Sequence, residues 1–567
     1  MHLSETINRR SFIKRASATF AATAVPGLSF ASQASDSSQY KALVCVYLSG
    51  GNDAWNTITP TSDPEYRAYA QSRGFGETWG LAIDKGSLLA IDKGDSIVAE
   101  GRYGMHPNLS QCHKLYQDGD LAVVSGVGPL VKPTTVDQYR SALSTNNKSH
   151  PLPSGLFGHN TQVNQWNCLN GTVSRPYGWA GRALDALYPL TQGQKLPVAM
   201  STSGQSQFLT GVRNIPFGVD PNGLQEFEGL TRGRFHSERA AAYRRLMSST
   251  LSTNAKTIYH KGFAEMQLRA LENAREIRKV IESAPNFNYL HDGTTLNRGQ
   301  ELASQLSTVA KLISARDTYE CKRQVFMVIA NGYDTHDNQM STQPTVLATL
   351  DRALDGFARA LKSMGVWDDV VTFTQSDFGR TLTSNGDGSD HGWSGLQLVL
   401  GGAVNGGRMV GSYPTLELGG PGEVGKGNFI PDVSADQYAA TLATWFGVSD
   451  RDLDVVCPHL KNFSKRDIGV FSASVDTDGD GVRDEIDTDD DNDGVSDVDD
   501  AFPLDSSETM DTDKDGVGNN ADTDDDGDGY DDVEELDYGS NPLDLEETPD
   551  LGGLPLPIIA DVLGLGR

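Results

Sequence analysis

The chain has 567 residues, 38% of them hydrophobic, and a formal net charge of −29. This length exceeds one ordinary core and predicts two or more domains, and the composition is that of a globular protein, not a disordered one. The negative charge is concentrated in residues 476–550, which hold 32 acidic and 2 basic residues. Such a stretch repels phosphates, which excludes nucleic acid as its partner and favours cations.

The chain also lacks the sequence signatures of two other classes, membrane-spanning proteins and disulfide-scaffold proteins. No run of residues is apolar and long enough to span a membrane. The five cysteines contain no C-x-x-C pair, which argues against a disulfide scaffold and leaves one or two bridges open.

Residues 1–34 have the features of a targeting segment and are set apart from the fold. Arg9 and Arg10 are followed by Phe12 and Lys14, then by a weakly apolar, Ala-rich stretch with two small-x-Ala sites. This pattern resembles a bacterial twin-arginine export signal, which implies a periplasmic, cell-surface or secreted protein.

Short apolar strands alternate with amphipathic helices along residues 41–471. Strands with their turns are expected within 42–48, 119–129, 323–336, 368–381 and 396–404, and helices within 234–284, 299–316, 345–365 and 434–448. The alternation predicts an α/β domain, with a mostly parallel sheet and helices on both faces. In such sheets, ligands collect beyond the carboxyl ends of the strands.

Metal-binding residue types follow these strand ends. Asp53 follows the first strand, Asp334 and His336 a later one, Asp377 the next, and His391 lies in a Gly-rich loop. Carboxylates and imidazoles form a ligand set for zinc, manganese, iron or magnesium. These five residues could hold two ions, which together clamp a phosphoryl or sulfuryl oxygen.

Each residue has a simpler interpretation when taken alone. Asp53 could only shape its turn, and His336 could be a hydrogen-bonded turn histidine. Arg380, three residues after Asp377, could grip an oxyanion as a fork or could bond to a nearby carbonyl. Their combination at one sheet edge favours a metal site.

Five motifs in a fixed order carry a family resemblance: "YLSGGNDAWNTITP", "NGYDTHDNQ", "SDFGRT", "DHGWSGLQLVLGG" and "SADQYAATLATWFGV". Residues 41–471 resemble the bacterial domain of unknown function 1501, whose core is similar to the alkaline phosphatase and sulfatase superfamily. The resemblance implies that fold, the five metal positions above, and a small ester or sulfated surface polysaccharide as substrate.

The resemblance also implies a Ser or Thr nucleophile at a helix start, and two candidates stay open. One is Thr134 or Thr135 in "KPTTVDQY". The other is the motif "LFGHNTQVNQW", where Gly158 precedes His159 at a position that is often Ser in the family. The predicted catalytic residues are Thr135, Arg380 and His159. A binding or adhesion protein that keeps the fold without catalysis is the alternative.

Residues 476–537 contain four similar acidic segments, which begin 13, 22 and 13 residues apart, so that a 35-residue unit occurs twice. Each has acids at loop positions 1, 3, 5 and 12, Gly at 6 and Asp or Asn at 9, as in an EF-hand calcium loop. A disordered acidic tail would not explain a glycine at a constant offset. The predicted Ca²⁺ ligands are Asp476, Asp478, Asp480, Asp484, Asp487, Asp489, Asp491, Asp493, Asp497, Asp500, Asp511, Asp513, Asp515, Asn519, Asp522, Asp524, Asp526, Asp528, Asp532 and Glu535.

These segments resemble thrombospondin type 3 repeats, without the helices that flank an EF-hand loop. The resemblance implies an extended calcium-binding array with a cell-surface or matrix partner. No function is predicted for residues 538–567.

Overall fold

A computed structural model describes most of the chain. The described residues are 40–91, 102–145, 150–169, 171, 176–204, 206–221, 230, 234–252, 257–287, 300–471, 477–478, 489–497 and 499–549. The predicted export signal lies outside this part of the chain, as do residues 550–567. Four predicted calcium ligands of the first acidic segment also lie outside it: Asp476, Asp480, Asp484 and Asp487.

A nine-stranded sheet forms the centre of residues 41–471, which we call the body, and β1 lies near the middle of this sheet. The strand order is β13-β5-β12-β9-β1-β8-β6-β7, and β14 also pairs with β5. Only β12 runs antiparallel to its neighbours in these pairings, so the predicted α/β class with a mostly parallel sheet is confirmed. The strands are β1 Lys41–Ser49, β5 Leu121–Gly128, β6 Ala199–Ser201, β7 Phe217–Gly218, β8 Arg323–Asn331, β9 Val370–Ser376, β12 Gly395–Leu400, β13 Met409–Val410 and β14 Val433–Ser434.

Two smaller sheets lie outside the main one. The first has the order β2-β4-β3 and the second is the hairpin β10-β11. Their strands are β2 Ile58–Pro60, β3 Leu89–Ile91, β4 Tyr103–Met105, β10 Arg380–Ser384 and β11 Ser389–His391.

The helices lie where the sequence predicts them, except that one expected stretch is divided into two helices. The helical stretch expected over 234–284 is two helices, α10 and α11, and the helix expected from 345 begins earlier, at Gln339. The helices are α2 Ala54–Thr57, α3 Asp63–Ser72, α4 Ser110–Asp118, α5 Val136–Thr145, α6 His159–Cys168, α7 Trp179–Ala186, α8 Tyr188–Thr191, α10 His236–Ser252, α11 Ile258–Ser283, α12 Gln300–Ser314, α13 Gln339–Ser363, α14 Ala435–Trp445, α15 Asp450–Val456 and α16 Asp532–Tyr538.

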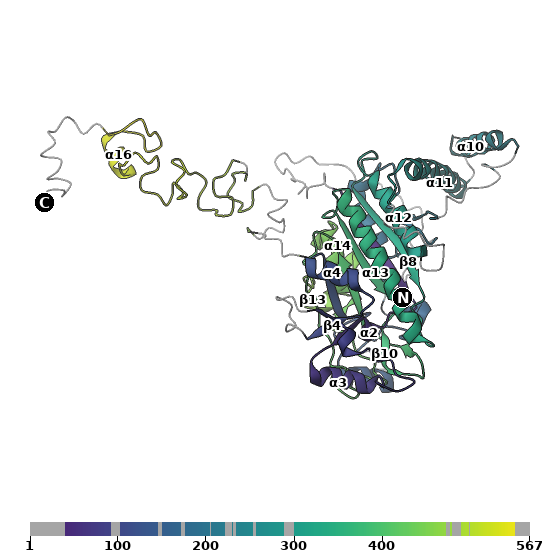
Figure 1. Ribbon diagram of the computed structural model, residues 1–567. Coiled ribbons are helices and arrows are strands. Elements are labelled where there is room, and N and C mark those ends of the chain that lie inside the picture. The colour runs from purple at the N-terminus through teal and green to yellow at the C-terminus, as the bar shows by residue number, and fades with distance from the viewer. Residues whose placement is uncertain are drawn as a thin grey trace, which may run out of the picture. The chain divides into compact units, whose positions relative to one another are not determined.

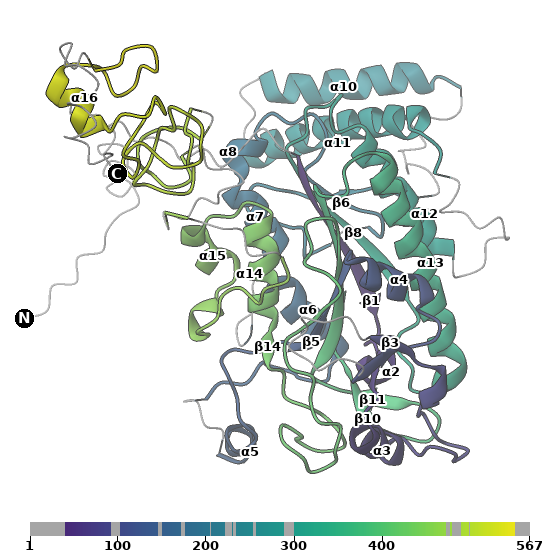
Figure 2. The same cartoon turned by 60° about the vertical axis from the view of Figure 1, so that its left-hand side comes forward.

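The sheet is buried on both faces, which explains why its central strands are continuously apolar. Along β1, Val44 and Val46 face a core shared with α4, α12 and α13. Leu43 and Cys45 face a second core, shared with α6, α7, α14 and α15. Figure 1 shows α12 and α13 along one side of the sheet, and Figure 2 shows α6, α7 and α14 on the other.

The carboxyl ends of three neighbouring strands meet at one edge of this sheet. Leu48 of β1 pairs with Ala330 of β8 and with Ser376 of β9, all in parallel. The chain then turns through Gly50, whose φ is +118°, and a Cβ there would lie 2.3 Å from the backbone nitrogen of Asp334. A glycine is therefore required to bring the β1 turn against the β8 turn.

The five cysteines are all buried free thiols, so neither of the bridges left open by the sequence is present. Within the described residues, no helix combines the length and the hydropathy needed to cross a membrane.

Candidate metal centre

One carboxylate and three imidazoles converge at this sheet edge. Asp334, just after β8, has its Oδ1 3.3 Å from Nε2 of His336 and 3.5 Å from Nε2 of His391. Its Oδ2 lies 3.5 Å from Nε2 of His159, the first residue of α6. The Nε2 atoms of His336 and His391 are 2.7 Å apart, which requires a shared proton or a shared cation between them. Nδ1 of His336 lies 3.5 Å from Asp390.

Hydrogen bonds on the far side of two rings fix which nitrogen faces the centre. Nδ1 of His391 is 2.7 Å from the carbonyl oxygen of Phe157, which can only accept, so Nδ1 carries the proton. Nδ1 of His159 is 2.6 Å from Asp377, whose other oxygen accepts from the Tyr47 hydroxyl. Both Nε2 atoms therefore point a lone pair inward. This is the support that metal-bound histidines usually receive.

Asp334 is held ionised by Arg380. Burial alone would raise the pKa of Asp334, but the hydrogen bond and charge of Arg380 outweigh it and lower that pKa below its usual value. The Arg380 side chain is 0% exposed and also donates to the carbonyls of Gly50, Gly51 and Ser389. The guanidinium of Arg380 therefore donates to the protein's own carbonyls and to Asp334. This agrees with the interpretation of Arg380 as a structural residue that bonds to a nearby carbonyl.

Aromatic packing covers one side of the centre. The ring of Phe378 stacks on His391 at 4.2 Å between centroids and lies 4.9 Å from His159. Burial, and then the nearby charge of Arg380, lower the pKa of His391, although its bond to Phe157 acts in the opposite direction. His391 is therefore held neutral, which is the form that binds a metal.

The donor chemistry at this point fits a divalent metal. Lone pairs of His159 and His391 face the carboxylate of Asp334, and the three ligand atoms lie within 4.8 Å of one another. A divalent cation between these atoms would accept a lone pair from each of them. A set of imidazoles with one carboxylate suits zinc, manganese or iron better than magnesium, which prefers oxygen.

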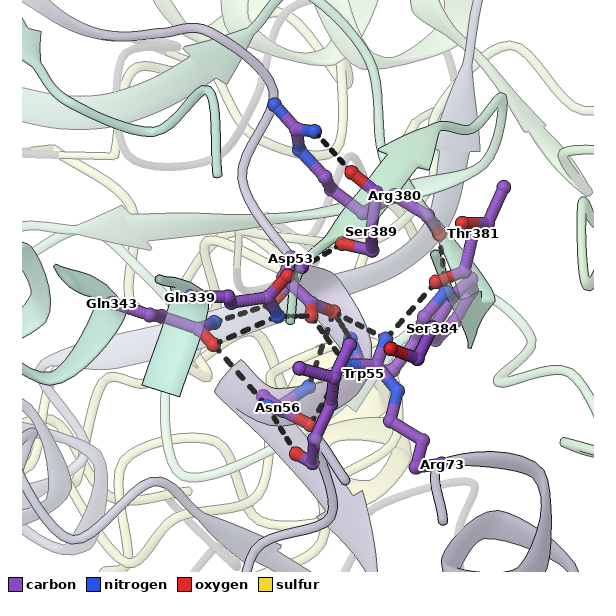
Figure 3. A network of polar contacts seen from close by, with 12 residues as sticks. Asp53, Trp55, Asn56, Arg73, Gln339, Gln343, Arg380, Thr381, Ser384 and Ser389 are labelled. Carbon is purple, nitrogen blue, oxygen red and sulfur yellow. Dashed lines mark hydrogen bonds and ion pairs between the residues drawn. The ribbon is translucent and has the colours of Figure 1, made fainter. Parts of the chain in front are cut away.

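Asp53, also predicted as a ligand, is held by buried polar contacts that reach Arg380 through Gln339 and Ser389 (Figure 3). It is the N-cap of α2 and accepts from the backbone nitrogens of Trp55 and Asn56. Its two oxygens lie 2.5 and 2.9 Å from the guanidinium of Arg73, and Gln339 donates to it as well. Asp53 is 2% exposed, and the structure does not place it among the converging ligands.

The candidate nucleophiles have structural partners of their own. Thr135 stands just before α5, where its Oγ1 accepts from the backbone nitrogen of Gln138 and its own nitrogen donates to the Gln138 side chain. This reciprocal pair is a helix capping box. The Thr134 hydroxyl contacts His150 at 2.9 Å. Among the described residues, neither threonine belongs to the converging set.

Three acidic loops within residues 476–537, which we call the tail, share one conformation. In each, the position-6 glycine nitrogen donates to the position-1 acid, and the position-2 nitrogen donates to the position-9 side chain. Nitrogens at positions 5 and 7 donate to the acids at 3 and 5. The glycines are Gly494, Gly516 and Gly529, with φ of +100°, +95° and +94°.

In two of these loops the acids at positions 1, 3 and 5 bring carboxylate oxygens within 4.8 Å of one another, and several buried oxygens have no hydrogen-bond partner. In the loop that begins at residue 524 they belong to positions 1, 3, 5 and 12, namely Asp524, Asp526, Asp528 and Glu535. In the loop that begins at residue 489 they include Asp491, Asp493 and Asp500. Burial, followed by repulsion from neighbouring carboxylates, raises the pKa of Asp491 and Asp526. Each loop therefore presents a concentrated negative charge inward.

Sequence reasoning did not find the groups that support the centre. The carbonyl of Phe157 is far in the chain from His391, which it holds, and the hydroxyl of Tyr47 is far from Asp377. No spacing rule connects them to the ligands. The motif around His159 was the one available signal, because it placed a histidine at a helix start.

The fold and this centre define an α/β protein with a histidine–carboxylate site at the carboxyl ends of its sheet strands. The chain belongs to the family described as "Protein of unknown function (DUF1501)", whose model matches residues 40–442. Comparison with curated proteins gives no match.

Several solved structures are weakly similar to the chain. The sulfatase PsFucS1 from Pseudoalteromonas sp. is 11% identical, with 73% of this chain and 68% of that chain covered and a TM-score of 0.28. The phosphonate monoester hydrolase SpPMH from Silicibacter pomeroyi is 10% identical, with coverages of 73% and 74% and a TM-score of 0.29. The lipoteichoic acid synthase LtaP from Listeria monocytogenes is 8% identical, with coverages of 74% and 76% and a TM-score of 0.26. At these TM-scores the likenesses carry no argument about function.

Proposed function

We propose that the body is a metal-dependent hydrolase of phosphate or sulfate esters. The observation that carries the proposal is the convergence of three Nε2 atoms on Asp334, with the far nitrogens of His159 and His391 each held by an acceptor. A purely structural turn has no need to direct the lone pairs of two histidines at one carboxylate. A divalent ion bound there would act as a Lewis acid that polarises an ester oxygen.

The chain's own residues would orient the ligands and attract the substrate. Asp377 keeps the proton of His159 on Nδ1, and Arg380 keeps Asp334 ionised. The centre also lies at the N-terminus of α6, a ten-residue helix whose first-turn amides favour an anionic group. Thr135 serves α5 in this proposal and not the chemistry. The substrate would be a small ester or a sulfated surface polysaccharide, met outside the cytoplasm after twin-arginine export.

The test is turnover of aryl phosphates and aryl sulfates by the full chain loaded with zinc, manganese, iron or magnesium. Asp334→Asn and His391→Ala should abolish turnover. His260→Ala, a change at an exposed histidine of α11 that contacts Thr257, should not. A chain that binds metal but turns over none of these esters would favour the alternative, a surface binding protein that keeps the fold.

We also propose that the tail binds calcium, on a separate observation. Buried, unpartnered oxygens stand at loop positions 1, 3, 5 and 12 of the loop at 524, and these are ligand positions of a calcium loop. Calcium titration of the full chain, followed by calorimetry and circular dichroism, should show saturable binding and ordering, and Asp526→Asn should remove one binding event. Unchanged signals at millimolar calcium would refute this function. The bound array would attach the protein to a cell-surface or matrix partner.

A further inference from the structure

We propose that the body holds a single metal ion and that two buried arginines take the place of a second one. The proposal rests on the metal centre proposed above. The five ligands expected from the sequence are enough for two ions, but the structure commits two of the three carboxylates elsewhere. These are Asp53 and Asp377.

Asp53 has no lone pair left for a metal (Figure 3). Its Oδ1 accepts from the Trp55 nitrogen at 3.1 Å, the Asn56 nitrogen at 3.4 Å and Arg73 at 2.9 Å. Its Oδ2 accepts from Arg73 at 2.5 Å and from Gln339. A carboxylate offers about four lone-pair positions, and five donors already approach this one. A metal could bind Asp53 only by displacing a buried ion pair.

Asp377 is also committed, although less completely. Its Oδ1 accepts from the Tyr47 hydroxyl at 2.9 Å and the Gly50 nitrogen at 3.1 Å, and its Oδ2 holds His159. Three donors leave one lone-pair position on Oδ2, and an ion bound there would compete with the contact that orients His159, a ligand of the first ion.

The two guanidinium groups supply fixed positive charge beside two of the three carboxylates. Arg73 pairs with Asp53 and Arg380 with Asp334, and both arginine side chains are 0% exposed. Neither can swing into solvent to admit a cation, since Arg73 also donates to the Thr381 carbonyl and Arg380 is bonded to backbone carbonyls. A second divalent ion would therefore meet two like charges in a medium of low dielectric constant. A guanidinium neutralises charge as that ion would, but it offers no open coordination position.

Metal counting on the full chain tests this inference. Protein stripped with a chelator is dialysed against zinc, with millimolar calcium present to occupy the tail, and zinc per chain is measured by elemental analysis. His391→Ala gives the background of the tail, and Asp337→Asn, at an exposed neighbour of the centre, is the matched control. The wild type and the control should each hold one zinc above background.

The variant that decides the role of the ion pair is Asp53→Asn with Arg73→Gln, which removes both buried charges together. It should still hold one zinc, measured on protein with a native circular dichroism spectrum. Two zinc ions in the wild type would overturn the inference and leave the metal centre intact. Loss of zinc from the folded double variant would also overturn the inference. No zinc in the wild type would overturn the centre and the inference together. If the double variant does not fold, the wild-type count decides.

Discussion

Replacing Asp377 by Asn should weaken metal binding without removing any proposed ligand. Asp377 is 3% exposed, and its Oδ1 already accepts from Tyr47 and from the nitrogen of Gly50. In the Asn variant the single amide oxygen stays with those two donors, so the amide NH₂ faces Nδ1 of His159. Two donors cannot face each other, and His159 must therefore move its proton to Nε2, the nitrogen that faces Asp334.

The size of the effect follows from this tautomer change. The loss of such a supporting contact costs about 10–100-fold in metal affinity, which corresponds to about 1.4–2.7 kcal/mol. The upper end is expected here, because the Asn both removes the acceptor and presents a donor in its place.

The assay is zinc competition against a chromophoric chelator, in millimolar calcium, with Asp337→Asn as the control. A folded Asp377→Asn protein with wild-type zinc affinity would refute the assignment of His159 as a ligand held by Asp377. Long-range nitrogen–proton spectra of the histidine rings give an independent readout, since the proton of His159 should appear on Nε2.

Three further predictions follow. Asp53→Asn leaves the buried Arg73 charge without its partner and should lower the free energy of unfolding by about 3–5 kcal/mol, measured by denaturant titration; a loss below about 1 kcal/mol would contradict the buried pair. Gly529→Ala forces a φ of +94° on a residue with a Cβ and should weaken calcium at that loop roughly tenfold by calorimetry, and equal affinity would show that the turn is not needed for binding. Thr135→Ala removes the cap of α5 and should cost about 1 kcal/mol while leaving any ester turnover unchanged, whereas loss of turnover would restore Thr135 as the nucleophile.

The sheet was predictable because its strands are marked locally. The continuous apolar run of β1 and its glycine turn require a buried parallel strand that ends in a tight loop, and the structure has both. The structure also brings Asp334 and His336, which follow β8, close to His391 of the β10-β11 hairpin. These outcomes depend on periodicity and topology, which a sequence displays directly.

The different side-chain partners of Asp53 and Asp334 were not predictable in the same way. Asp53 and Asp334 both follow strands, yet one is saturated by Arg73 and the other faces three imidazoles. That difference depends on where α3 and α6 dock, and docking is decided by packing between segments far apart in the chain. Arg380 was found as a site residue, but only the structure shows that its donors face backbone carbonyls.

The acidic loops have a mechanical consequence. The hydrogen bonds that close each loop join residues at most nine apart, so a loop can form or open without waiting for distant parts of the chain. A fully extended chain spans about 3.4 Å per residue, so one 35-residue unit can lengthen to on the order of 120 Å when its loops open. If calcium closes the loops, the concentration of a single ion would set the reach and stiffness of the tail, and single-molecule extension with and without calcium would measure that reach directly.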